Sequence, residues 1–194
     1  GGSLAFCNVE LSRTREQSLL DHVTYLGAES YLMGASVREL LAMANPGASE
    51  AAMWESLDRV NLKDYFEGEE GLDTTIQSGG SNLSGGQRQR LSLAMALLHD
   101  TPVYIFDEVT SNIDVESEEK IVDEIRTLAE TRMVLFISHR LANVKDAGRL
   151  MVLDQGHLVE EGTHEELIAK GGMYKALWKT QAELEQYRGG EVYA

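Results

Sequence analysis

Residues 83–108 read LSGGQRQRLSLAMALLHDTPVYIFDE, and this stretch decides the fold. Its first part predicts a long helix, because Ser84 and Gln87 have the spacing of a capping box, which satisfies backbone N–H groups at the N-terminus of a helix. Two glycines at a helix start leave N–H groups and the positive end of the helix dipole open to an anion. Leu83–Gln87 therefore indicates a phosphate-binding turn, and a plain capped helix after a glycine turn is the alternative. The helix continues through apolar residues at helical spacing, at Leu91, Ala94, Met95 and Leu98.

The second part of the stretch is an apolar strand that ends in two acids. Val103–Phe106 has the composition of a buried strand in a parallel sheet, and Asp107 and Glu108 follow it. Ligands of such sheets bind at the carboxyl ends of the strands. Asp107 is a candidate ligand of Mg²⁺, a hard cation that keeps several waters, and Glu108 is a candidate base for an attacking water. An ordinary strand end with two solvated acids is the alternative.

Other apolar runs extend this pattern to an α/β fold. We expect short strands at Ser3–Glu10 and His22–Leu26. Met133–Ile137 and Arg149–Leu153 are expected to be buried strands that join Val103–Phe106 in a mostly parallel sheet. Helices are predicted after Asp114 and from Met173 onward, and a helical insert is predicted between Ser36 and His99. In that insert, Ser36 and Glu39 form another capping box, and Asn45-Pro46-Gly47 ends the first helix.

Ser138-His139-Arg140 directly follows the predicted strand Met133–Ile137. A histidine at this edge of the sheet can contact a phosphate and polarise water. A structural role for His139 is the alternative, since most single histidines are structural.

Composition excludes several classes of protein. The chain has 194 residues and a formal net charge of −15, which counts against binding to nucleic acid or to an anionic membrane surface. The single cysteine, Cys7, cannot form an internal disulfide, which fits a reducing compartment. No apolar run reaches the roughly 18 residues of a spanning helix, and the N-terminus lacks the basic region of a signal peptide.

The order of these features resembles that of ATP-binding-cassette (ABC) ATPases, over about residues 2–181. A glycine-rich signature loop, a helix, an acidic strand, Ser111–Asp114, a further strand and His139 follow one another as in that family. The exporter-type branch is indicated by the stretches 139–144, 152–156, 160–167 and 172–178.

This resemblance implies a role for each site residue. The signature loop, which binds the γ-phosphate of ATP held by a partner subunit, corresponds to Ser84, Gly85, Gly86 and Gln87. Asp107 matches the Walker B aspartate that binds Mg²⁺, Glu108 the catalytic glutamate and His139 the switch histidine. Ser111 and Asp114 fall in the loop that faces the partner's phosphate site.

Three departures from the family pattern are visible. None of the six lysines follows a glycine, so the Walker A P-loop is absent. We therefore expect a C-terminal fragment of a longer protein, without the first strand and P-loop of the P-loop NTPase-like core. Ala28 stands where the Q-loop glutamine is expected, which puts coupling or the activity of this half-site in doubt. Ser78 stands where exporters carry a glutamate before the signature.

The resemblance implies a division of the chain and a function. Residues 1–35 and 100–170 are expected to form the ATPase core, 36–99 a helical subdomain with the signature loop, and 171–194 a C-terminal helix and tail. The implied function is that of the nucleotide-binding domain of an exporter, an ATPase that uses ATP and Mg²⁺ at the cytoplasmic face of a membrane. Its implied partners are a second ABC ATPase domain and transmembrane domains, not nucleic acid. A non-catalytic regulatory half of a heterodimer is the alternative, favoured by Ala28.

Overall fold

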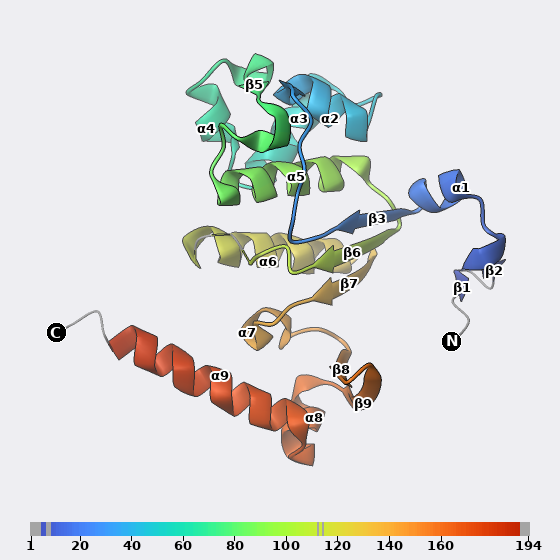
Figure 1. Ribbon diagram of the computed structural model, residues 1–194, viewed down its shortest axis with the longest axis vertical. Helices are drawn as coiled ribbons and strands as arrows, with labels where there is room; N and C mark the ends of the chain where they lie inside the picture. The colour runs from blue at the N-terminus through green and yellow to red at the C-terminus, as the bar shows by residue number, and fades with distance from the viewer. Residues whose placement is uncertain (1–4, 7–8, 112, 114, 191–194) are drawn as a thin grey trace. The chain divides into compact units, whose positions relative to one another are not determined.

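A computed structural model describes residues 5, 6, 9–111, 113 and 115–190, which divide into two units, 1–137 and 138–194 (Figure 1). The strands and helices of the first unit are β1 (Ala5–Phe6), β2 (Val9–Glu10), α1 (Glu16–Leu20), β3 (Val23–Leu26), β4 (Ala35–Ser36), α2 (Val37–Ala44), α3 (Glu50–Arg59), α4 (Lys63–Glu67), β5 (Thr75–Ile76), α5 (Gly85–His99), β6 (Val103–Asp107), α6 (Val115–Ala129) and β7 (Met133–Ile137). Those of the second unit are α7 (Leu141–Val144), β8 (Leu150–Asp154), β9 (His157–Gly162), α8 (His164–Lys170) and α9 (Met173–Gly190). No helix in these described ranges is both long and apolar enough to cross a membrane.

A parallel sheet of three strands, in the order β3-β6-β7, forms the frame of the first unit. Its register places Tyr25 beside Ile105 and Ile105 beside Leu135, so these side chains share one face. The opposite face carries Tyr104 and Phe106, which are fully buried. The fold class predicted from the sequence is therefore confirmed, with β6 in the centre.

The two faces of this sheet differ in exposure. Helices α5 and α6 pack against the strands, and Tyr104 and Phe106 belong to the large core of the unit. The other face leaves Tyr25 63%, Met133 67% and Ile137 44% exposed. Parallel sheets are normally covered on both faces, so this open apolar face is unusual.

The helical segment between Ser36 and His99 forms a layer on α5. Helices α2 and α3 pack against α5, and the predicted caps at Ser36 and Asn45 are confirmed (Figure 1). Buried Leu41, Leu57 and Leu91 lie in the core of the unit. The sequence did not predict the antiparallel pair formed by β4 and β5 or the short helix α4. The boundaries of a separate helical subdomain, 36–99, stay a prediction.

Two strand predictions differ from the structure, one in its bounds and one in its pairing. The strand expected at Ser3–Glu10 is instead an antiparallel pair, β1 and β2, in which Phe6 lies opposite Val9.

The strand expected at Arg149–Leu153 does not join the parallel sheet. It is β8, which pairs antiparallel with β9, a strand that the sequence reasoning missed. The turn between them is Gln155-Gly156, and both residues have positive φ, 46° and 79°. Two successive residues in this conformation match the right-handed twist of a two-residue hairpin. Apolar character alone indicated a strand there, whereas the turn decided its partner.

The second unit has a small core of its own. Leu150, Leu167 and Tyr174 are buried, and Trp178 packs against them. The buried Glu160 accepts a hydrogen bond from the backbone N–H of Tyr174 at 2.7 Å, in the first turn of α9. A carboxylate at this end of a helix is favourable because it satisfies an unpaired N–H group and faces the positive end of the dipole.

Candidate functional site

The predicted signature loop lies at the beginning of α5. Ser84 is the N-cap: its hydroxyl accepts from the N–H of Gln87 at 3.1 Å, and the Gln87 side chain accepts from the N–H of Ser84 at 2.9 Å. The capping box expected from the sequence is thus confirmed. Gly85 and Gly86 are the first helical residues, where helix geometry leaves backbone N–H groups without partners inside the helix. Because Gly85 is also exposed, this turn is open to an anion.

Helix α5 and strand β6 place two parts of the predicted site on the same side of the unit. The short link Asp100–Pro102 joins the end of α5 to the start of β6, so the two elements run in opposite directions (Figure 1). The beginning of α5 and the carboxyl end of β6 therefore both point away from this link. The signature turn and the acidic pair lie in neighbouring layers at this end.

Asp107 is the last residue of the central strand β6 and is half-buried. Its Oδ2 accepts a hydrogen bond from the hydroxyl of Tyr25 on β3, over 3.3 Å. Both side chains lie on the open face of the sheet, in agreement with the register. Partial desolvation raises the pKa of the Tyr25 phenol, and the negative charge of Asp107 raises it further. The phenol therefore stays protonated near neutral pH and acts as a donor to the carboxylate.

Glu108 has an unusual backbone conformation. Its φ is 54°, in the left-handed region, which is uncommon for any residue other than glycine. Its N–H donates to the carbonyl of Ile137 at the end of β7, and its carbonyl accepts from the N–H of Ser111 at 3.1 Å. Val109 and Thr110, the next two residues of the turn, are buried. Strained residues of this kind are held in place by their surroundings and concentrate at functional sites.

The strain at Glu108 predicts an ordering of two variants. Glu108→Gly and Glu108→Ala both remove the carboxylate, but only glycine adopts this φ without a steric penalty. We expect Glu108→Gly to be more stable to unfolding than Glu108→Ala by about 1 kcal/mol, measured by urea denaturation of the two variants side by side. Equal midpoints, or a more stable alanine variant, would contradict a left-handed Glu108.

The remaining predicted residues are placed separately. Ser111 is exposed in the turn after Glu108. Asp114 lies outside the described residues. His139 belongs to the second unit, where it is exposed, and its backbone carbonyl accepts a hydrogen bond from the Gln181 side chain on α9.

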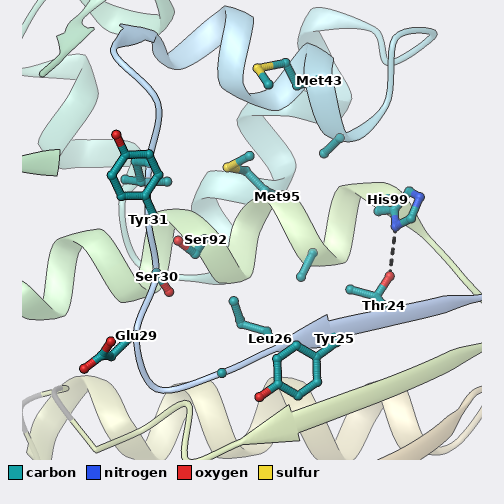
Figure 2. Close-up of a pocket in the computed structure, with 14 residues that line it drawn as sticks. Thr24, Tyr25, Leu26, Glu29, Ser30, Tyr31, Met43, Ser92, Met95 and His99 are labelled. Atoms are coloured by element: carbon teal, nitrogen blue, oxygen red, sulfur yellow. Dashed lines mark hydrogen bonds between the residues drawn. The ribbon is translucent and has the colours of Figure 1, made fainter. Parts of the chain in front are cut away.

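Sequence reasoning missed two features, the hydrogen-bond partner of Asp107 and an open pocket at the loop after β3. Tyr25 appeared only as one apolar residue of a strand, although its alternation with buried Thr24 and Leu26 marks it as a residue of the opposite face. The pocket, of about 410 Å³, lies between the loop after β3 and helices α2 and α5 (Figure 2). Tyr31 and Met43 contribute exposed side chains to it.

Comparison with known proteins places the chain in a family. Residues 1–111 match the family model described as ABC transporter. The chain is 43% identical over 187 residues to an uncharacterized ABC transporter ATP-binding protein of Haemophilus influenzae, covering 96% of this chain and 33% of that protein. It is 36% identical over 183 residues to the ATP-dependent lipid A-core flippase 1 of Colwellia psychrerythraea, covering 94% of this chain and 30% of the flippase.

A solved structure agrees with these relatives. A bacterial Atm1-family ABC exporter with ATP bound superposes with a TM-score of 0.89 and 30% identity, over 94% of this chain and 32% of the exporter chain. The chain thus spans about a third of the length of the proteins it matches. The fold expected from the resemblance, an ABC ATPase core, is confirmed by this superposition. From its family match, its sequence relatives and its fold, this chain belongs to the ABC transporter family.

Proposed function

We propose that this chain is part of the nucleotide-binding domain of an exporter-type transporter, in which ATP binding and hydrolysis drive transport across a membrane. The observation that carries the proposal is the end of β6, where Asp107 is the last residue of the central strand and the strained Glu108 follows it. A flippase described as ATP-dependent and an exporter solved with ATP bound are among the relatives.

In this proposal each site residue has one task. Ser84, Gly85, Gly86 and Gln87 present the open turn of α5 to the γ-phosphate of an ATP held by a partner domain. Glu108 orients the attacking water and takes its proton. His139 contacts the γ-phosphate, and the Ser111–Asp114 loop faces the partner's phosphate site. The mechanism is one of positioning and charge stabilisation, as in phosphoryl transfer generally.

Asp107 fits the Mg²⁺ that accompanies ATP. The described residues contain no group of three potential ligands that could enclose a metal by themselves. A full set of protein ligands is not expected for Mg²⁺, because this ion binds through one or two carboxylates, substrate phosphates and water. When bound, Mg²⁺ neutralises charge on the phosphates. Tyr25 fixes one oxygen of Asp107 and leaves the other for the metal or its waters.

Replacing Asp107 tests this site. Asp107→Asn keeps the size of the side chain and removes its charge. We expect the Mg²⁺ concentration for half-maximal ATP hydrolysis by the whole protein to rise at least about tenfold. Asp64→Asn, at an exposed acid on α4, is the matched control and should leave the Mg²⁺ dependence unchanged. An unchanged Mg²⁺ dependence in Asp107→Asn would remove Asp107 from the metal site.

A second ATPase domain is one of the proposed partners. The P-loop that holds the β- and γ-phosphates is not among these 194 residues. The open apolar face of the sheet, with Asp107 on it, supports a further segment of the protein that covers this face and brings a P-loop to the edge. A second ATPase domain supplies the other half of each ATP site.

The transmembrane domains are the other proposed partners. The pocket beside α2 and α5, with exposed Tyr31 and Met43, supports docking of a membrane-spanning partner on the helical segment. The chain would then act at the cytoplasmic face of the membrane. A regulatory, non-catalytic half of a heterodimer is the second candidate. It is favoured by Ala28, which cannot supply the side-chain amide expected in this loop.

A further inference from the structure

The loop that carries Ala28 is fixed to the signature helix by one buried side chain. Gln89 of α5 is only 3% exposed. Its amide nitrogen donates to the backbone carbonyl of Gly27 at 3.0 Å, and its amide oxygen accepts from the hydroxyl of Ser30 at 3.2 Å. Gln89 therefore hydrogen-bonds to the loop 27–34 on both sides of Ala28, and this loop crosses α5 in Figure 2.

The same loop is also hydrogen-bonded to the turn Ser78–Gly80, which precedes the signature loop. The N–H of Gly79 donates to the carbonyl of Leu32 at 2.8 Å, and the hydroxyls of Tyr31 and Ser78 are 3.0 Å apart. Arg88, next to Gln89, donates from Nη1 to the carbonyl of Gly79 at 3.0 Å. Polar contacts thus join the loop to the turn, the turn to α5, and α5 to the loop.

These contacts connect the two parts of the candidate site. Gln89 lies five residues after the N-cap Ser84, less than two helical turns from the signature loop. The loop 27–34 continues directly from β3, whose Tyr25 holds Asp107. A buried amide that loses its partners is costly, so a shift of the loop without α5 is opposed at Gln89.

We propose that Gln89 is a positioning residue that makes the loop 27–34 and the signature loop move as one body. In this chain a side chain of α5 makes the link, and the loop itself carries alanine at position 28. The inference rests on the proposed function, since it assigns a consequence of the link to ATP turnover.

The test compares variants of the whole protein by hydrogen exchange and by ATPase kinetics. Gln89→Met keeps the length of the side chain and removes both hydrogen bonds, whereas Ser30→Ala removes one. Ser56→Ala is the control, because its buried hydroxyl bonds only to the backbone of its own helix, at Met53.

We expect amide exchange in peptides covering 27–34 to be roughly tenfold faster in Gln89→Met. We expect kcat for ATP to fall by a similar factor while KM changes less than about twofold, because the signature loop acts when the domains close on ATP already bound. Ser30→Ala should show the same changes with a smaller magnitude. If Gln89→Met does not fold, Ser30→Ala still tests the proposal.

Exchange and kcat in Gln89→Met that match those of Ser56→Ala would overturn the proposal. An equal loss of kcat in Gln89→Met and Ser56→Ala would also overturn it, because equal losses indicate general destabilisation of the protein. The exchange measurement needs no ATP turnover, so a failure of the proposed function, seen as full activity in Glu108→Gln, is distinguishable from a failure of this link.

Discussion

Replacing Glu108 with glutamine is expected to lower ATP turnover by the whole protein at least about 100-fold, while Mg-ATP still binds. Glutamine keeps the size and polarity of the side chain but cannot take a proton from water. The backbone at position 108 is expected to keep its left-handed conformation, because glutamate and glutamine have a similar steric cost there. The carboxyl end of β6 therefore keeps its geometry and loses only its base. Phosphate release and nucleotide binding, measured on the same sample, separate the two effects.

The control for this experiment is Glu130→Gln, at an exposed acid just after α6. It should leave turnover unchanged. Unchanged turnover in Glu108→Gln itself would favour the regulatory alternative, in which this half binds nucleotide without hydrolysing it. Loss of nucleotide binding together with turnover would instead indicate that the carboxylate serves the structure of the turn.

Replacing Gly85 with aspartate is expected to separate stability from activity. Gly85 is the first residue of α5, and an acid in the first turn faces the positive end of the helix dipole. Aspartate there also replaces the poorest non-proline helix former, so the protein should be as stable as the wild type or slightly more so. The same carboxylate puts negative charge where the γ-phosphate is proposed to bind. ATP turnover should therefore fall at least about 100-fold.

The matched control for Gly85→Asp is Gly148→Asp, because an added side chain at Gly148 meets nothing within 4 Å. Thermal unfolding and phosphate release are measured for both variants. A stable Gly85→Asp variant with normal turnover would show that no phosphate approaches the beginning of α5. An unfolded variant would contradict the helix-end geometry described for this turn.

Local signals allowed much of the fold to be predicted from the sequence. Capping boxes at Ser36 and Ser84 set two helix starts within one residue, because each cap is formed by residues three apart in the chain. The errors at Ser3–Glu10 and Arg149–Leu153 arose because apolar runs predict a strand but neither its exact bounds nor its partner. In the second case the turn Gln155-Gly156 carried the missing information.

The site was predictable only in part. Asp107 and Glu108 could be located because a buried strand ends at them, and Ser84 because it begins a helix. The hydrogen bonds of Tyr25 and Gln89 join residues 82 and 62 positions apart in the chain. Such contacts depend on the register of β3 with β6 and on the packing of α5, which no local pattern in the sequence specifies.

The central claim is that the beginning of α5 contacts the γ-phosphate of ATP. The most direct test places a cysteine there, as Ser84→Cys, in the whole protein and adds an ATP analogue with a thiol-reactive group on its γ-phosphate. Ser81→Cys, an exposed position three residues earlier, is the matched control, and the wild type gives the background. The account predicts labelling of Ser84→Cys that excess ATP suppresses, with little labelling of Ser81→Cys. Equal labelling at both positions, or none at position 84 in a protein that binds ATP, would contradict it.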